Sequence, residues 1–235
     1  MKTLQHICAL TLSLAAAAGS VHAGDDSGVV LLEANFNDKP LDQQIGTGGP
    51  ELGEPISIFP GLSAIVRAAP MSTPSLELSE TATGMALPAR FEFLGGEEVT
   101  HGDLNIHIRI EAAQNDTFQV YVREPHTAAQ NFATILFTGS GGISAFDQNG
   151  TIGVIGSYSI GVERELGLLF HMDDGTYDIK FGGAILATGR AHGISGHGIG
   201  SVAVGTTSTT TPGSLFYVDR LRVTRGDGVF RNGFD

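Results

Sequence analysis

The chain has 235 residues and a formal charge of −12 at pH 7, from 25 acidic and 13 basic side chains. An acidic surface repels nucleic acid, anionic lipid and polyanionic sugars, so the composition argues against a nucleic-acid-binding protein. Glycine contributes 33 residues and tryptophan none, and the apolar stretches are short and rich in Val, Ile, Leu and Phe. Glycine or Asn/Asp turns bound these stretches, a composition typical of many short strands and therefore of an all-β protein.

The first 23 residues, "MKTLQHICALTLSLAAAAGSVHA", have the order of a secretory signal peptide. Lys2 precedes an apolar run, and the stretch ends at Ala23, where we expect cleavage. Removal of this segment takes away Lys2 alone among the charged residues and moves the charge from −12 to −13. It also removes Cys8, the single cysteine, so the mature protein needs no disulfide. No later run reaches the roughly 18 apolar residues of a membrane span, and we expect a secreted protein, periplasmic or extracellular.

Strand-like patterns extend from residue 28 to residue 225 and predict one β-sandwich domain, with tails at 24–27 and 226–235. "VVLLEANF" opens this domain and "SLFYVDRLRV" closes it. In the closing stretch one set of positions, Phe216, Val218, Arg220 and Val223, alternates only in part, which predicts a β-bulge or burial on both faces. The stretch "LGLLFHMDDGTYDIKFGGAILATG", residues 166–189, is interpreted as a β-meander with turns at 173–175 and 182–183.

Two further strands show strict alternation of apolar and polar residues. In "DLNIHIRIE" the apolar positions run from Leu104 to Ile110, and in "TFQVYVRE" they run from Phe118 to Val122. A period of two indicates a strand with one buried face. The linking "AAQND" is interpreted as a hairpin turn, so we expect the two strands to pair side by side.

The opening "EANFND", the "DGTYDIKFGG" meander and the closing "FYVDRLRV" resemble, in this order, the concanavalin A-like (laminin-G-like) jelly-roll sandwiches. These are secreted modules of lectins, carbohydrate-binding domains, glycosidases and polysaccharide lyases. The resemblance covers most of the mature chain as architecture and implies a two-sheet antiparallel jelly roll. Fold alone does not give function.

The resemblance also implies a weak structural calcium site where the opening and closing strands meet. In such modules a D-F-E-like strand and an aromatic-x-D strand hold the ion together. The matching residues here are Asn37 and Asp38 at the opening and Asp219 at the close, with asparagines at both opening carboxylate positions. Calcium prefers six to eight oxygen ligands, several of them charged, so this set predicts a weak site. The alternative is that Asp38 is a turn residue and Asp219 a hydrogen-bonded strand residue.

The polar faces of the two alternating strands are the predicted binding surface, made of Asn105, His107, Arg109, Gln119, Tyr121 and Arg123. A polysaccharide lyase needs a Tyr or His base together with Arg, Gln or Asn to neutralise a uronate. His107, Arg109, Gln119 and Tyr121 supply that inventory and form the catalytic alternative. Any antiparallel sheet with one wet face shows the same pattern, and we favour this simpler interpretation.

Two other patterns suggest chemistry less strongly. Glu163 and Glu165 have the spacing of a glycosidase carboxylate pair on one strand, but the fuller glycosidase motif is absent and we favour a solvated strand face. His192 and His197 would bind zinc or copper only with a third ligand from elsewhere, and a surface loop is the simpler expectation. We therefore expect an exported, non-catalytic module whose partner is a carbohydrate or another surface protein, with a carbohydrate-active enzyme as the rival.

Overall fold

The computed structural model describes residues 28–45, 56–81, 86, 88–112, 116–125, 131–147, 150–192 and 197–226. The predicted signal peptide, residues 24–27 and residues 227–235 lie outside the described residues. The described chain consists of strands β1 to β15 and one 3-10 turn, Leu94–Gly96. No helix among these residues has the length and apolarity needed to cross a membrane. The predicted all-β class is confirmed.

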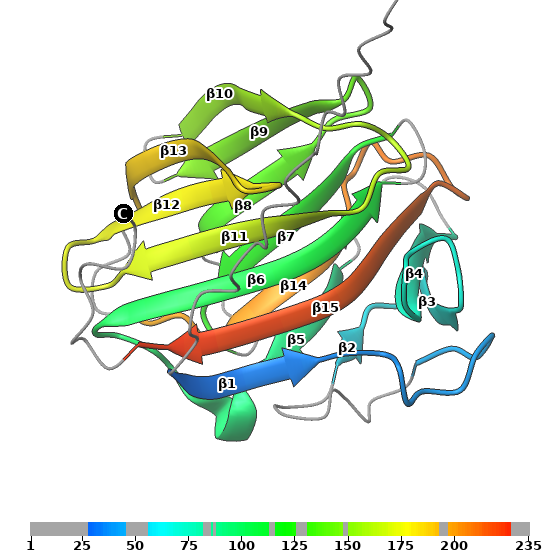
Figure 1. Cartoon of the computed structure of the whole chain (residues 1–235), viewed down its shortest axis with the longest axis horizontal. Coiled ribbons are helices and arrows are strands. Elements are labelled where there is room, and N and C mark those ends of the chain that lie inside the picture. The colour runs from blue at the N-terminus through cyan, green and yellow to red at the C-terminus, as the bar shows by residue number, and fades with distance from the viewer. Residues whose placement is uncertain are drawn as a thin grey trace, which may run out of the picture.

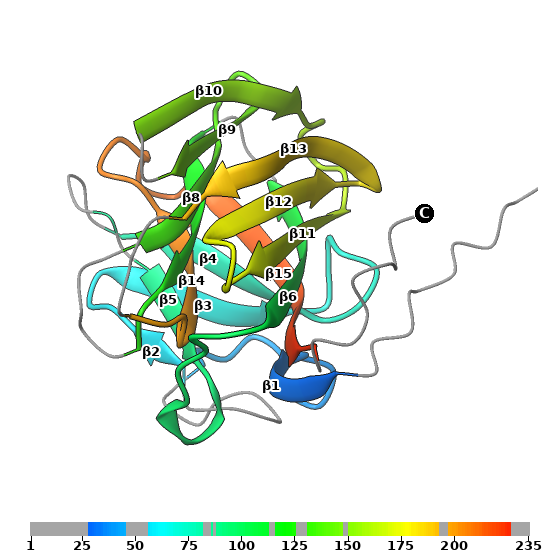
Figure 2. The same cartoon turned by 90° about the vertical axis from the view of Figure 1, so that its left-hand side faces the viewer.

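The strands form two antiparallel sheets packed as a sandwich (Figures 1 and 2). Sheet A runs in the order β13 (Ala184–Ala191), β12 (Thr176–Phe181), β11 (Arg164–His171), β6 (Asp103–Ala112), β15 (Leu215–Arg225), β4 (Ser75–Glu80) and β3 (Leu62–Arg67), and β1 (Val29–Ala34) also pairs with β15. Sheet B runs in the order β10 (Gly150–Ser157), β9 (Gly142–Asp147), β8 (Asn131–Phe137), β7 (Phe118–Arg123), β14 (Ser201–Thr206), β5 (Pro88–Glu92) and β2 (Ser57–Ile58).

The core lies between the sheets and is made by the apolar positions that the alternation predicts. On β6 the four apolar residues from Leu104 to Ile110 are buried, and on β7 Phe118, Val120 and Val122 are fully buried. Phe118 stacks on Phe216 of β15 with ring centroids 4.8 Å apart, so the two rings join sheet B to sheet A. Each fully buried side chain of this size contributes roughly 1.5–3 kcal/mol.

The hairpin predicted between the two alternating strands is wrong. β6 pairs with β11 and β15 in sheet A, whereas β7 pairs with β8 and β14 in sheet B. The chain therefore crosses from one sheet to the other between residues 112 and 118. The alternation fits both arrangements, because a strand buries one face whether its sequence neighbour lies beside it or across the core.

The predicted meander is confirmed, since β11, β12 and β13 are consecutive neighbours in sheet A. Its second turn contains Gly182 and Gly183, whose φ angles are 57° and 85°. Glycine adopts this left-handed region without the steric cost that a Cβ atom brings. The two glycines that predicted this turn are therefore required by its backbone conformation.

The first and last strands meet as the resemblance implies, with Ala34 of β1 opposite Leu221 of β15. β15 pairs with β4 through Leu215–Val218 and with β1 from Leu221 onward. The register of β15 against β6 shifts between Val218 and Leu221, so the predicted bulge is present. Asp219 lies in this bulge, at the point where the strand changes partner.

Candidate functional site

The six predicted binding residues lie on opposite outer faces of the sandwich. Asn105, His107 and Arg109 alternate with the buried residues of β6 and face outward from sheet A. Gln119, Tyr121 and Arg123 alternate with the buried residues of β7 and face outward from sheet B. Figure 2 shows the two layers from the side, with β6 in one and β14 in the other. The two triplets therefore belong to two separate surfaces.

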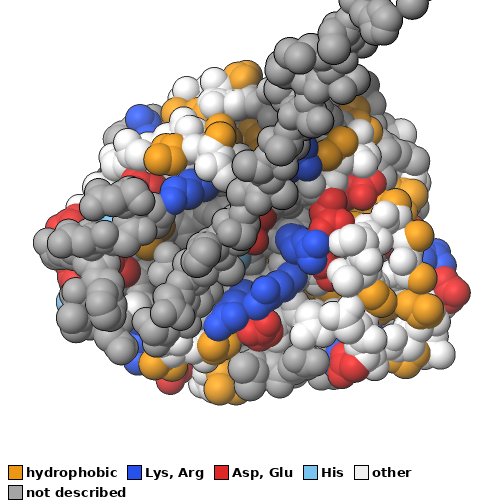
Figure 3. Space-filling view, in the orientation of Figure 1, with side chains coloured by type: hydrophobic (Ala, Val, Ile, Leu, Met, Phe, Trp, Pro, Cys, Tyr) orange, Lys and Arg blue, Asp and Glu red, His pale blue; other side chains and the backbone are white. Residues whose placement is uncertain are grey.

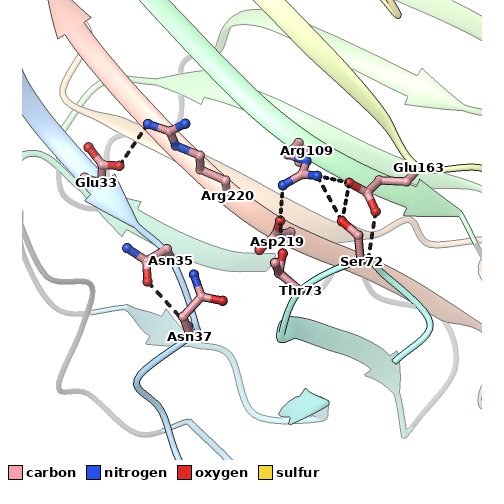
Figure 4. Close-up of polar contacts among 9 residues, drawn as sticks. All are labelled: Glu33, Asn35, Asn37, Ser72, Thr73, Arg109, Glu163, Asp219 and Arg220. Carbon is pink, nitrogen blue, oxygen red and sulfur yellow. Dashed lines mark hydrogen bonds and ion pairs between the residues drawn. The ribbon is translucent and has the colours of Figure 1, made fainter. Parts of the chain in front are cut away.

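On sheet A, Arg109 is the centre of a polar network that sequence analysis did not foresee (Figure 4). Its Nη1 donates to Asp219 Oδ2 at 2.8 Å, and its Nη2 donates to Ser72 Oγ at 3.0 Å. Nη2 also forms a close ion pair with Glu163. Thr73 Oγ1 donates to the same Asp219 oxygen at 2.7 Å. The guanidinium is thus held by partners from three other segments of the chain.

The Glu163 carboxylate is held by hydrogen bonds from Ser72 and by the ion pair with Arg109. The backbone N–H and the hydroxyl of Ser72 donate to its two oxygens at 2.9 and 3.1 Å. Burial acts to raise the pKa of the Glu163 carboxyl, but the hydrogen bonds from Ser72 and the charge of Arg109 outweigh it and leave this pKa below its ordinary value. The network therefore attaches the β3–β4 connection and the start of β11 to the centre of sheet A. This role is structural.

The second member of the predicted glycosidase pair, Glu165, has a different partner. Its Oε1 lies 3.0 Å from His107 Nδ1, and this hydrogen bond is the main reason that its pKa is lowered. Close by, Arg220 Nη2 donates to Glu33 at 3.1 Å. Figure 3 shows a band of Lys and Arg side chains over β15 and β6 that ends against acidic side chains. The outer face of sheet A thus carries a network of ion pairs. This agrees with the solvated strand face that sequence analysis favoured for Glu163 and Glu165.

The three predicted calcium ligands occupy different surroundings. Asp219 is 2% exposed and accepts from Arg109 and Thr73. Asp38 is exposed and accepts from Lys39 at 3.2 Å, and the backbone N–H of Asn37 donates to Asn35 Oδ1 at 3.4 Å. In the part of the chain that the structure describes, no three His, Cys, Asp or Glu side chains are grouped to hold a metal ion. The calcium site, whose proposed ligands include an asparagine, stays a prediction.

The two loop histidines also differ from each other. His192 is buried, and its ring lies against Phe132 and Phe170 with centroids 5.4 and 5.8 Å away. Burial lowers its pKa, which favours the neutral imidazole. His197 is exposed, and its Nδ1 lies 3.1 Å from Glu124 Oε1. His192 is a core residue, where sequence analysis expected a surface loop.

On sheet B the outward residues form two rows across the central strands. One row places Arg90 of β5, Ala203 of β14, Tyr121 of β7 and Thr134 of β8 in register. The other places Glu92, Ser201, Arg123 and Asn131 in register. The outward positions of β14 carry only small side chains, and both Ser201 and Ala203 are fully buried, so the outer face is covered over this strand.

The polar residues of this surface differ in how they are held. Gln119 is buried, and its Nε2 donates to the carbonyl of Thr206 at 2.5 Å, so it joins β7 to the end of β14. Tyr121 is partly buried, and this burial raises its pKa to about 12. Arg90 was missed by sequence analysis, although its place between the buried Ala89 and Phe91 is a signal of an outward position.

Comparison with known proteins finds the fold and no family. No protein-family model matches the chain, and no curated protein matches its sequence. The chain is similar to a carbohydrate esterase of the Shiga toxin-encoding bacteriophage phi24B, at 14% identity and a TM-score of 0.57 over 85% of this chain and 100% of that one. It is similar to a sialidase at 10% identity and a TM-score of 0.55, over 73% of this chain and 17% of that one.

A third similar structure is the receptor-binding domain of a botulinum neurotoxin C/D mosaic serotype. Its identity is 9% and its TM-score 0.53, over 85% of this chain and 48% of that one. The chain spans 17% to 28% of the length of the sialidases that it matches. At such identities the likeness shows a shared β-sandwich fold alone.

Proposed function

We propose that the chain is an exported, non-catalytic sandwich module of the concanavalin A-like kind, which binds a glycan through the outer face of sheet B. The observation that carries this proposal is the contrast between the two outer faces. On sheet A, Arg109 and His107 already hold carboxylates of the same chain. On sheet B, Tyr121 is partly exposed, beside the small and buried Ala203 of β14. A sugar ring can stack on the exposed part of an aromatic side chain.

Three further points support the proposal. The signal sequence predicts export, which would bring the module into contact with surface glycans. A carbohydrate esterase and a sialidase share the sandwich fold at low identity. The two-sheet architecture agrees with the concanavalin A-like resemblance of the opening, meander and closing segments.

A lyase or a glycosidase is the weaker candidate. A general base works best when its pKa lies near the working pH, whereas burial moves the pKa of Tyr121 to about 12. His107, the other proposed base, lies in the opposite sheet. The Glu163 carboxylate is held by Arg109 and Ser72. These positions favour recognition over catalysis.

A glycan array probed with the purified protein and two variants tests the proposal. Tyr121→Ala should lose the retained glycan, whereas His107→Ala, which changes the other face, should keep it. Melting curves of both variants show whether each is folded. Absence of any retained glycan, or equal loss in both folded variants, would contradict the proposed function.

A further inference from the structure

A hollow of about 240 Å³ opens between the two sheets, and no residue of β7 lines it. Its lining comes from the end of β10 with the connection that follows, the start of β11 and the end of β12 with its turn, namely Ser157, Tyr158, Ser159, Val162, Arg164, Phe181 and Gly182. Pockets that bury drug-sized ligands measure roughly 300–1,000 Å³. The hollow therefore suits one small group, such as a single sugar ring or a phosphate.

Arg164 is the charged residue of this lining. Its register partner in β6 is the buried Ile110, and on β11 it shares the core-facing side with the buried Leu166 and Leu168. Side chains two residues apart on a strand point to the same side. The exposed Arg164 therefore extends into the space between the sheets at the point where the core opens to solvent.

The guanidinium of Arg164 is held without an acidic partner. Its Nη1 donates to the backbone carbonyl of Glu163 at 2.9 Å, and it forms no ion pair with any residue that the structure describes. The adjacent carboxylates are engaged elsewhere, since Glu163 holds Arg109 and Glu165 holds His107. In a chain with 25 acidic and 13 basic side chains, this uncompensated positive charge favours an external anion.

The arginine stem is positioned by the β12–β13 turn. A Cβ atom at Gly182 would lie 3.0 Å from Arg164 Cδ and 3.5 Å from its Nε, and the φ angle of Gly182 is 57°. Any other residue would therefore strain the turn and crowd the arginine. Glycine at this position lets the stem pack directly over the turn.

The opposite wall combines free hydroxyls with a fixed aromatic ring. Ser157 and Ser159 are exposed, and their hydroxyls make no hydrogen bond within the described part of the chain. Between them Tyr158 is anchored, because its hydroxyl donates to the carbonyl of Thr138 at 2.8 Å and its ring packs edge-on against Phe137 with centroids 5.5 Å apart. The wall thus offers two hydrogen-bond donors on either side of an immobilised ring.

We propose that this hollow binds a small molecule that carries an oxyanion, a carboxylate, sulfate or phosphate group. Arg164 is its charged partner, because a planar guanidinium binds two oxygens of such a group in parallel. Ser157 and Ser159 donate their hydroxyls to the remaining oxygens. The acidic surface of the chain repels an extended polyanion, which limits the ligand to a small molecule. This site is separate from the surface around Tyr121 and goes beyond the glycan-binding function proposed above.

An NMR titration of backbone amide shifts at constant ionic strength tests the assignment. The probes are phosphate, sulfate and acetate as free anions, glucuronate and glucose 6-phosphate as anionic sugars, and glucose as the neutral control. We expect saturable shifts in the lining residues. Arg164→Gln should weaken binding at least tenfold, and Arg164→Lys should weaken it less. The matched control is Arg225→Gln, since Arg225 is also exposed and without an ion pair among the described residues but lies outside the hollow.

The probes also identify the source of the oxyanion. Tenfold tighter binding of an anionic sugar than of the corresponding free anion assigns the oxyanion to a sugar, and equal or weaker binding assigns it to the free anion. Both results support the site. Shifts that do not saturate, equal binding of glucose and glucuronate, or equal affinities in Arg164→Gln and Arg225→Gln would overturn it. The double variant Ser157→Ala, Ser159→Ala, which keeps the arginine, should weaken binding severalfold and gives a second test.

Discussion

Arg109 and Asp219 lie 110 residues apart in the sequence and form an ion pair of 2.8 Å at the bulge of β15. The bulge marks the point where β15 exchanges β4 for β1 as its neighbour. Asp219 is buried, while the Arg109 side chain is 35% exposed. The pair therefore fastens the irregular part of a central strand to β6, and it joins a residue predicted to bind ligand to one predicted to bind metal.

Loss of the Asp219 carboxylate should destabilise the fold. Asp219→Asn leaves Arg109 without its buried partner, and we expect a loss of about 2–3 kcal/mol, below the 3–5 kcal/mol of a fully buried pair because the guanidinium is partly solvated. Chemical denaturation measures the change. The matched control is Asp38→Asn, whose exposed pair with Lys39 should contribute less than about 1 kcal/mol. Equal effects of the two substitutions would contradict the structural role of Asp219.

The calcium site predicted by resemblance is tested by melting the protein in 1 mM calcium and in a chelator. A site with a dissociation constant of about 10⁻⁴–10⁻³ M, typical of extracellular modules, would add roughly 0.4–1.4 kcal/mol at that concentration. The gain should disappear in Asp219→Asn. If the wild-type curves coincide, Asp219 serves Arg109 and Thr73 and holds no ion.

Two glutamates on the face of sheet A should respond to pH in opposite directions. Glu111 is 5% exposed, and burial together with the nearby Glu163 raises its pKa. A carboxyl whose folded pKa is raised favours folding at low pH and opposes it once both states are ionised. Glu111→Gln should therefore raise the melting temperature at pH 7 and change it little at pH 4, where the carboxyl is largely protonated in both states.

Glu165 is the matched control for this experiment, because the hydrogen bond from His107 lowers its pKa. A lowered carboxyl pKa stabilises the fold above the unfolded value, and that stabilisation is lost as the pH falls through the folded value. Glu165→Gln should therefore lower the melting temperature at pH 7, with a smaller effect near pH 4. Two substitutions with the same sign at pH 7 would contradict the assignment.

The contact between the sheets should be among the most sensitive parts of the fold. Phe216 is fully buried and stacks on Phe118 across the core. Phe216→Ala should cost about 3–5 kcal/mol, because it removes apolar contacts and leaves a cavity. Phe216→Leu, which keeps more of the volume, should cost less. Denaturant unfolding separates the two, and a loss below about 1 kcal/mol for the alanine variant would show that the sheets pack without this ring.

The sequence predicts which residues of a strand are buried better than it predicts which sheet the strand joins. The apolar positions of β6 and β7 were predicted because burial favours one face of each strand, and this preference appears in every second residue. The sheet to which each strand belongs depends on distant partners, such as Ile106 with Val223. That choice leaves no trace in local alternation, which is why the hairpin prediction failed and the binding triplets separated.

The Arg109 network on sheet A and the outer face of sheet B also depend on residues far apart in the sequence, which local patterns do not reveal. The bulge in β15 was predicted from a break in periodicity, but its partner Arg109 is 110 residues away. Ser72 and Thr73 lie in a connection whose sequence signals only turns. The surroundings of Tyr121 on sheet B need β7 and β14 to be adjacent, and that order exists only after folding.

The central claim is that the outer face of sheet B, and not that of sheet A, binds the ligand. Backbone amide chemical-shift mapping by NMR, with the best oligosaccharide from the array, tests it most directly. The account predicts that the largest shifts lie in β7 and its neighbours β8 and β14, around Tyr121. Largest shifts in β6, β11 and β15, around Arg109 and Asp219, would contradict it.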